Sequence, residues 1–115
     1  MGKSNGKALK RTIKFLSICK NPQIISHIIE RSPDSVIKSI CNAALNVAQG
    51  DVVLNNRQKK ILAGKRRFIE QLISKGDSVK QKRKLIQKGG SILGFLIPTI
   101  LGTVLSSLGS KLFSK

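Results

Sequence analysis

The chain has 115 residues, 40% of them hydrophobic, and its 22 Lys and Arg against five Asp and Glu give a formal net charge of +17 at pH 7. This length allows one small domain with a short appendage and excludes two independent hydrophobic cores. A charge of one sign destabilises a compact chain by self-repulsion, so it indicates a polyanionic partner, either nucleic acid or an anionic membrane surface.

The first part of the chain predicts a basic tail and two helices. Residues 1–6 are expected to form a flexible basic tail. From Lys7 to Cys19, apolar residues recur every three or four positions with lysines between them, which predicts an amphipathic helix. Asn21-Pro22 then predicts a helix boundary, because Asn is a good N-cap and Pro is tolerated at the first helical position.

A third helix is predicted between Ser32 and Gly50, with the most regular apolar periodicity of the chain. Ser32 is expected to be its N-cap, and Asp34 would lie favourably near the positive end of the helix. Gly50 is expected to end it, because glycine adopts the left-handed conformation common at helix C-termini.

A short extended linker follows, in which Val52 and Leu54 are expected to pack against the core. Asn55 or Asn56 is then expected to open a longer helix that reaches Ser74. This helix begins the most basic part of the chain.

A further basic helix is predicted in residues 75–88, capped by Asp77 or Ser78. No segment alternates apolar and polar residues over the length of a strand, so the predicted fold class is all-α. We expect a small bundle of four to five helices, with residues 7–74 as its body and residues 89–115 as an appended hydrophobic C-terminal segment that contains a helix.

Catalytic chemistry has little support in the sequence. His27 is the only histidine and lies among isoleucines, where a helix residue is a simpler interpretation than a base. Cys19 and Cys41 do not form a zinc-binding spacing with it. They are expected to be reduced thiols packed as small hydrophobes, and a disulfide between them is the alternative. We therefore expect a protein that is not an enzyme and that holds no cofactor or metal.

Two consecutive predicted helices carry a strong excess of cations. A solvated helix normally mixes both signs, so this excess favours contact with phosphates over a merely hydrated face. Residues that stack on bases are scarce, with no Trp or Tyr, so we expect non-specific binding to the nucleic-acid backbone that weakens with salt. The predicted nucleic-acid-binding residues are Arg57, Lys59, Lys60, Lys65, Arg66, Arg67, Lys80, Lys82, Arg83, Lys84 and Lys88.

The segment of residues 89–110 carries no charge. As one helix it would extend about 33 Å, enough to cross a hydrocarbon layer, although Pro98 would kink it. It would otherwise lie in the interface of an anionic membrane, or pack against a partner protein or a second copy. The predicted membrane residues are Ile92, Leu93, Phe95, Leu96, Ile97, Ile100, Leu101, Val104, Leu105 and Leu108.

A basic segment, a QKGG junction and an apolar end rich in Leu, Pro and Gly follow one another in the last part of the chain. In this order the sequence resembles a family of small basic proteins from animal Polinton (Maverick) elements and adintoviruses. The residues that match here are Lys82, Arg83, Lys84, Leu85, Gln87, Lys88, Gly89, Gly90, Leu96, Pro98, Leu101 and Leu105. Upstream, the similar residues are Ile40, Cys41, Ala44, Asn46, Val47, Gly50, Leu54, Gln58 and Lys59.

The resemblance covers about residues 33–109 and implies a minor virion or core protein, comparable in role to adenoviral basic core proteins or membrane-active internal proteins. It implies a location in the virion and, during infection, in the host nucleus or at a membrane. The sequence departs from the family at the junction, which is GGSILGFL in place of a GGFL type, and at its end, with Lys111 and Lys115.

The leading hypothesis from the sequence is an accessory virion protein with two functions. Its basic helices would bind the packaged genome, and its C-terminal segment would engage or disrupt a membrane. Two alternatives remain: a membrane-active or anchoring protein without a nucleic-acid role, and a scaffold whose apolar helix docks on a capsid protein or on a second copy.

Overall fold

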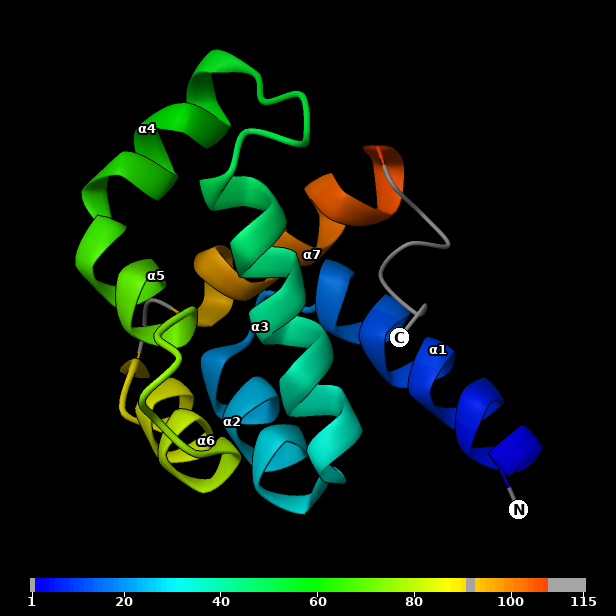
Figure 1. Ribbon diagram of the computed structural model, residues 1–115. Helices are drawn as coiled ribbons and strands as arrows, with labels where there is room; N and C mark the ends of the chain where they lie inside the picture. Colours follow the sequence, from blue (N-terminus) through cyan, green and yellow to red (C-terminus); the bar gives the residue numbers. More distant parts are fainter. Residues whose placement is uncertain (1, 91–92, 108–115) are drawn as a thin grey trace.

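The computed structural model describes residues 2–90 and 93–107, and side chains within residues 7–90 and 93–106 (Figure 1). The described residues form seven α-helices and no strand, which confirms the predicted all-α class. The helices are α1 (Gly2–Ile18), α2 (Pro22–Arg31), α3 (Asp34–Ala48), α4 (Asn56–Gly64), α5 (Arg66–Leu72), α6 (Val79–Gln87) and α7 (Leu93–Ser107).

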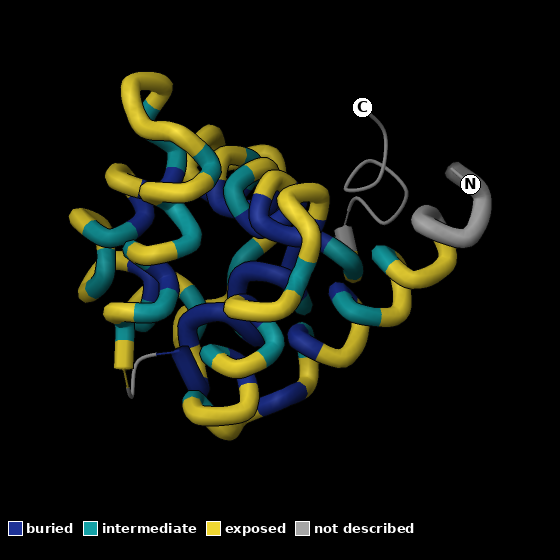
Figure 2. Tube along the Cα trace, turned by 90° about the horizontal axis from the view of Figure 1, so that it is seen from below, coloured by how far each residue is buried: buried dark blue, intermediate teal, exposed yellow. Residues whose placement is uncertain are grey.

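Helix α1 packs on the bundle by its C-terminal half and extends away from it at its N-terminal end (Figures 1 and 2). Ile13 and Leu16 are fully buried, whereas Lys7, Arg11 and Lys14 are exposed. The backbone of residues 2–6 continues this helix, where the sequence suggested a flexible tail.

The next two helices begin at Pro22 and Asp34, close to the predicted starts. Asn21 caps α2 as expected, since its Oδ1 accepts from the backbone N–H of Gln23 at 2.9 Å. Ser32 does not cap α3: Pro33 occupies that position, and the Ser32 hydroxyl donates to the carbonyl of Ile28 instead.

The predicted long helix after Asn55 is divided into α4 and α5. Asn55 caps α4 in a capping box with Gln58, in which each side chain accepts from the other residue's backbone N–H. The helix is interrupted at Lys65, whose φ of −118° and ψ of 27° lie outside the helical range. This interruption raises the number of helices above the predicted four to five.

The expectation of an appended C-terminal helix is wrong, because α7 lies at the centre of the bundle. It packs against α1 and α3, and also against α2 and α4 (Figure 1). Six aliphatic side chains of α7 are fully buried, and burial of each stabilises the fold by about 1.5–3 kcal/mol. They are Leu93, Leu96, Ile97, Ile100, Leu101 and Val104.

The central position of α7 has a simple physical cause. The amphipathic helices α1 and α3 each leave an apolar face that needs a partner, and a helix without charges can be enclosed on several sides. Gly94 allows α7 to approach the loop between α1 and α2 closely, because a Cβ at this position would meet the backbone carbonyl of Lys20. Only a narrow stripe of α7 remains in contact with solvent, marked by Phe95 and Ser106.

Candidate nucleic-acid interface

The predicted basic residues divide between two faces of α4 and α5. One face lines a groove. The residues of α4, of α5 and just after α5 that line it recur every three or four positions, and the interruption at Lys65 does not break this spacing. They are Lys59, Leu62, Ala63, Arg66, Ile69, Glu70 and Ile73. Residues on another face of α4 and α5 therefore also share one side of the two helices. These are Arg57, Lys60, Arg67 and Gln71, and all of them are exposed.

This second face continues onto α6. Gln71 lines a shallow groove of about 270 Å³ between α5 and α6, together with Lys84 and Lys88. Lys80 is exposed one helical turn before Lys84. We use the name basic track for this exposed series from α4 to α6: Arg57, Lys60, Arg67, Lys80, Lys84 and Lys88.

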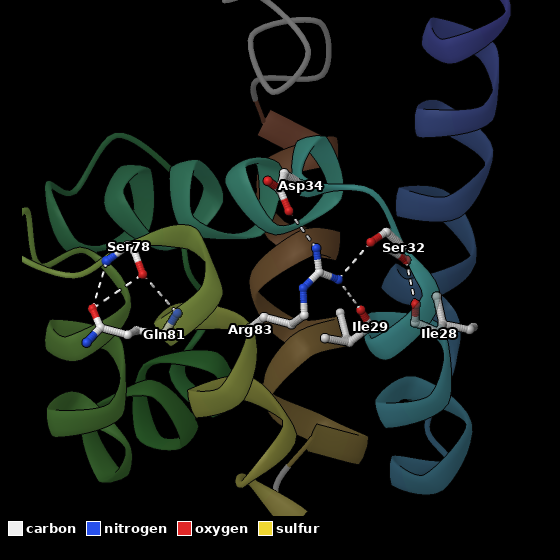
Figure 3. Close-up of polar contacts among 7 residues, drawn as sticks. All are labelled: Ile28, Ile29, Ser32, Asp34, Ser78, Gln81 and Arg83. Carbon is white, nitrogen blue, oxygen red and sulfur yellow. Dashed lines mark hydrogen bonds and ion pairs between the residues drawn. The ribbon is translucent and has the colours of Figure 1, made fainter.

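The groove between α5 and α6 also presents a side-chain amide. Ser78 and Gln81 form a capping box at the start of α6: Gln81 Oε1 accepts from the Ser78 backbone N–H at 2.9 Å, and Ser78 Oγ accepts from the Gln81 N–H at 3.2 Å (Figure 3). Because the oxygen of Gln81 is held by this cap, its amide nitrogen is the end that can donate to a ligand. Asp77 is the acid among the lining residues and limits how deeply an anion would enter.

Arg83, in the middle of the basic run, has a structural role. Its Nη1 donates to the carbonyls of Ile29 and Ser32, at 2.5 and 2.7 Å, and its Nη2 donates to Asp34 Oδ1 at 2.8 Å (Figure 3). Its side chain is only 18% exposed. The guanidinium thus satisfies carbonyls at the C-terminal end of α2 and fixes α6 against the start of α3.

Two further predicted residues are half-buried. Lys82 lies near Cys41, whose pKa is raised by burial, while the positive charge of Lys82 acts in the opposite direction. Lys65 lies at the interruption between α4 and α5. Neither position offers a fully solvent-exposed ammonium group.

Lys59 and Arg66 belong to the groove face rather than to the basic track. Arg66 forms an exposed ion pair with Glu70, one turn later, at 3.4 Å. The structure therefore does not bring all the predicted phosphate-binding residues onto one surface.

The site prediction omitted the basic residues of α1. Lys7, Arg11 and Lys14 are exposed on the helix that extends from the bundle. The signal was present in the sequence, since residues 1–20 contain several basic groups and no acid. These residues form a second cationic element, and α1 lies on a different side of the bundle from α4, α5 and α6 (Figure 1).

The predicted membrane residues lie mostly in the core. Six of the ten are fully buried, as given above; Leu105 is half-buried, and Phe95 is 42% exposed. Ile92 and Leu108 lie outside the described residues. Over the part of the chain that the structure describes, no helix is both long enough and apolar enough to cross a bilayer.

Other side chains with reactive or ligating groups are dispersed. Within residues 2–90 and 93–107, no three His, Cys, Asp or Glu side chains come together as a metal site would require. Cys19 and Cys41 are free thiols, the first buried and the second half-buried. His27 is exposed on α2, in a surface depression that it shares with Gln23 and Glu30.

Comparisons with protein-family models, with curated proteins and with solved structures find no match to this chain.

Proposed function

We propose that this protein binds nucleic acid through the phosphate backbone, without reading the base sequence. One observation carries the proposal: a chain with a net charge of +17 exposes the six cations of the basic track between the start of α4 and the end of α6. Few carboxylates neutralise this surface, because the chain has only five acids and one of them, Asp34, pairs with Arg83.

The chemistry of the basic track suits phosphates. Lysine ammonium groups on a solvent-exposed helix displace the counterions condensed on a duplex, and this release favours association. The amide of Gln81 and the side chain of Gln71 add uncharged groups beside Lys84 and Lys88. Phe68, the aromatic residue of α5, is half-buried in the core, so backbone contact rather than base stacking is the expected mode.

The setting that we propose is the interior of a virion, with the packaged genome as the ligand. The support for this setting is the resemblance of residues 33–109 to small basic proteins of Polinton elements and adintoviruses. Capsid-enclosed genomes need cations to offset phosphate repulsion, and a protein with this charge would supply them.

Salt dependence of binding to a labelled DNA duplex tests the proposal. Lys84→Ala with Lys88→Ala should lower the slope of log affinity against log salt by about 2, since each phosphate contact contributes about 0.9. Lys59→Ala with Arg66→Ala is the matched control, because it removes the same charge from residues that line the other groove and lie outside the basic track. An unchanged slope in the first pair would refute the phosphate claim. Equal losses in both pairs would mean that net charge alone drives binding.

A second candidate function is membrane engagement by α7, favoured by the lack of any charged residue in that helix. Because its apolar side chains are in the core, membrane contact would require α7 to leave the bundle. Anionic lipid attracted to the basic helices would be the trigger.

A reversible crosslink between α1 and α7 tests this second function. A Cβ at Gly102 would lie 3.8 Å from the carbonyl oxygen of Ser17, so cysteines at these two positions are close enough to be tried as a disulfide. Cys19 and Cys41 would be replaced by Ala in this variant. Dye leakage from anionic liposomes by the reduced form only would support release of α7. Leakage by both forms, or by neither, would reject it.

A further inference from the structure

An apolar groove lies on a different face of α4 and α5 from the basic track. It has a volume of about 370 Å³ and is bounded by the C-terminal end of α3, the loop before α4, and both helices. Aliphatic side chains form its walls: Val47 and Ala48 from α3, Leu54 from the loop, Leu62 and Ala63 from α4, and Ile69 from α5.

The groove exists because small residues stand where a closed core would need large ones. Ala48 and Ala63 line it and are both exposed. More apolar surface is exposed on the same elements, since Leu45 of α3 is 38% exposed and Val53 in the loop before α4 is 84% exposed. Exposed apolar surface gathered in one region marks interaction sites on soluble proteins.

The rim of the groove is cationic. Lys59 and Arg66 lie along its edge against one carboxylate, Glu70. The contact between Arg66 and Glu70 is an exposed pair at 3.4 Å, which contributes little stability and can be exchanged for a stronger partner. An occupant with aliphatic side chains flanked by carboxylates would therefore match both the floor and the rim.

Three other kinds of occupant match the groove less well, because of their charge, their chemistry or their shape. A second copy of this chain would bring a second charge of +17 to the interface. A nucleic-acid duplex offers phosphates to the rim but no aliphatic group for the floor. A bilayer surface is broad and would not enter a recess between three helices.

We propose that this groove docks an amphipathic segment of a partner protein, with aliphatic anchors on one side and acidic residues beside them. Helix-in-groove recognition uses anchors at helical spacing in this way. The proposal is independent of nucleic-acid binding, because it uses a face of α4 and α5 that lies outside the basic track.

The experiment is a selection from an unbiased library of displayed random peptides against the full chain, followed by affinity measurements on the recovered peptides. Ala63→Trp fills the groove without removing a core side chain. Ala8→Trp, on the exposed part of α1, is the matched control. Circular dichroism melting establishes that both variants fold.

Recovered peptides are expected to combine aliphatic residues at intervals of three or four with Asp or Glu. Ala63→Trp should weaken their binding by about tenfold or more, Lys59→Glu should weaken it similarly, and Ala8→Trp should leave it unchanged. Peptides that lack acids, or that bind Ala63→Trp as well as the parent chain, would overturn the proposal. So would an absence of recovered peptides.

Two other measurements, sedimentation and binding to a DNA duplex, test the alternative occupants. If sedimentation shows a dimer that Ala63→Trp converts to monomer, the groove serves self-association and the proposal fails. It fails equally if Ala63→Trp weakens binding to a DNA duplex as much as it weakens peptide binding, because the groove would then belong to the nucleic-acid interface.

Discussion

Helices α6 and α7 are neighbours in the sequence and opposites in the structure. Helix α6 carries four cations, of which Lys80 and Lys84 are exposed, and Ile86 is its one fully buried side chain. Helix α7 carries no charge and supplies much of the core. The comparison teaches that the apolar segment forms the core around which the basic helices pack. The charged surface and the apolar core therefore belong to the same domain.

The largest expected effect comes from placing a charge in α7. Ile97→Asp would bury an unpaired carboxylate in the core, which should cost about 5 kcal/mol or more and abolish the folded state of a domain this small. Phe95→Asp, on the exposed stripe of the same helix, should leave the protein folded. Denaturant unfolding followed by circular dichroism measures both. A folded Ile97→Asp would show that α7 is an appendage after all.

The next effect concerns how closely α7 approaches the loop between α1 and α2. Gly94→Ala would place a methyl group against the Lys20 backbone carbonyl and 3.2 Å from Pro22 Cδ, and should destabilise by about 3 kcal/mol. Gly102→Ala meets only the Ser17 carbonyl oxygen, at 3.8 Å, and should be neutral or stabilising by about 0.5–1 kcal/mol. Thermal unfolding of the two variants checks the contrast. Equal stabilities would contradict the close contact at Gly94.

Two adjacent cations of α6, Arg83 and Lys84, should differ in what their removal changes: the first should affect the stability of the protein, and the second its affinity for DNA. Arg83→Ala removes three hydrogen bonds to α2 and α3 and should destabilise by about 2 kcal/mol. Lys84→Ala should leave stability unchanged and weaken DNA binding instead. Unfolding and duplex-binding titrations on both variants provide the test. If Arg83→Ala weakened binding and not stability, the structural role of Arg83 would be refuted.

The smallest effect is a dependence of stability on pH that comes from Cys41. Burial raises the pKa of this thiol in the folded state, so folding favours its protonated form. This stabilisation is fully present below the usual thiol pKa and is lost as the pH rises through the raised value. Unfolding curves from about pH 7 to about pH 10 should therefore show a decline that Cys41→Ala reduces. An identical decline in Cys41→Ala would remove the thiol as its cause.

Local chemistry made the helix starts predictable. Asn21, Asn55 and Ser78 cap their helices as the sequence indicates, because a cap depends on residues two or three positions away. Val52 is buried and Leu54 half-buried in the linker, as expected from their apolar character. The interruption at Lys65 has a weaker local signal, Gly64, which lowers helix propensity but does not forbid a continuous helix.

The candidate site was less predictable, because it depends on which helices pack together. Sequence alone lists Lys82, Arg83 and Lys84 as one cationic run, yet their exposure differs once α6 lies against α2 and α3. The same reason explains α7: an uncharged segment is suited both to lipid and to the centre of a bundle. The apolar faces of α1 and α3 need a partner helix, and this requirement is what favours the centre of the bundle over lipid.

The central position of α7 also bears on how the protein is made. Of the seven helices, α7 is the last to leave the ribosome, yet α1, α2 and α3 all pack against it. The N-terminal helices therefore cannot bury their apolar faces against α7 until residues 93–107 have emerged. Folding depends on contacts between distant parts of the chain. During that interval the apolar faces of α1 and α3 are exposed to solvent.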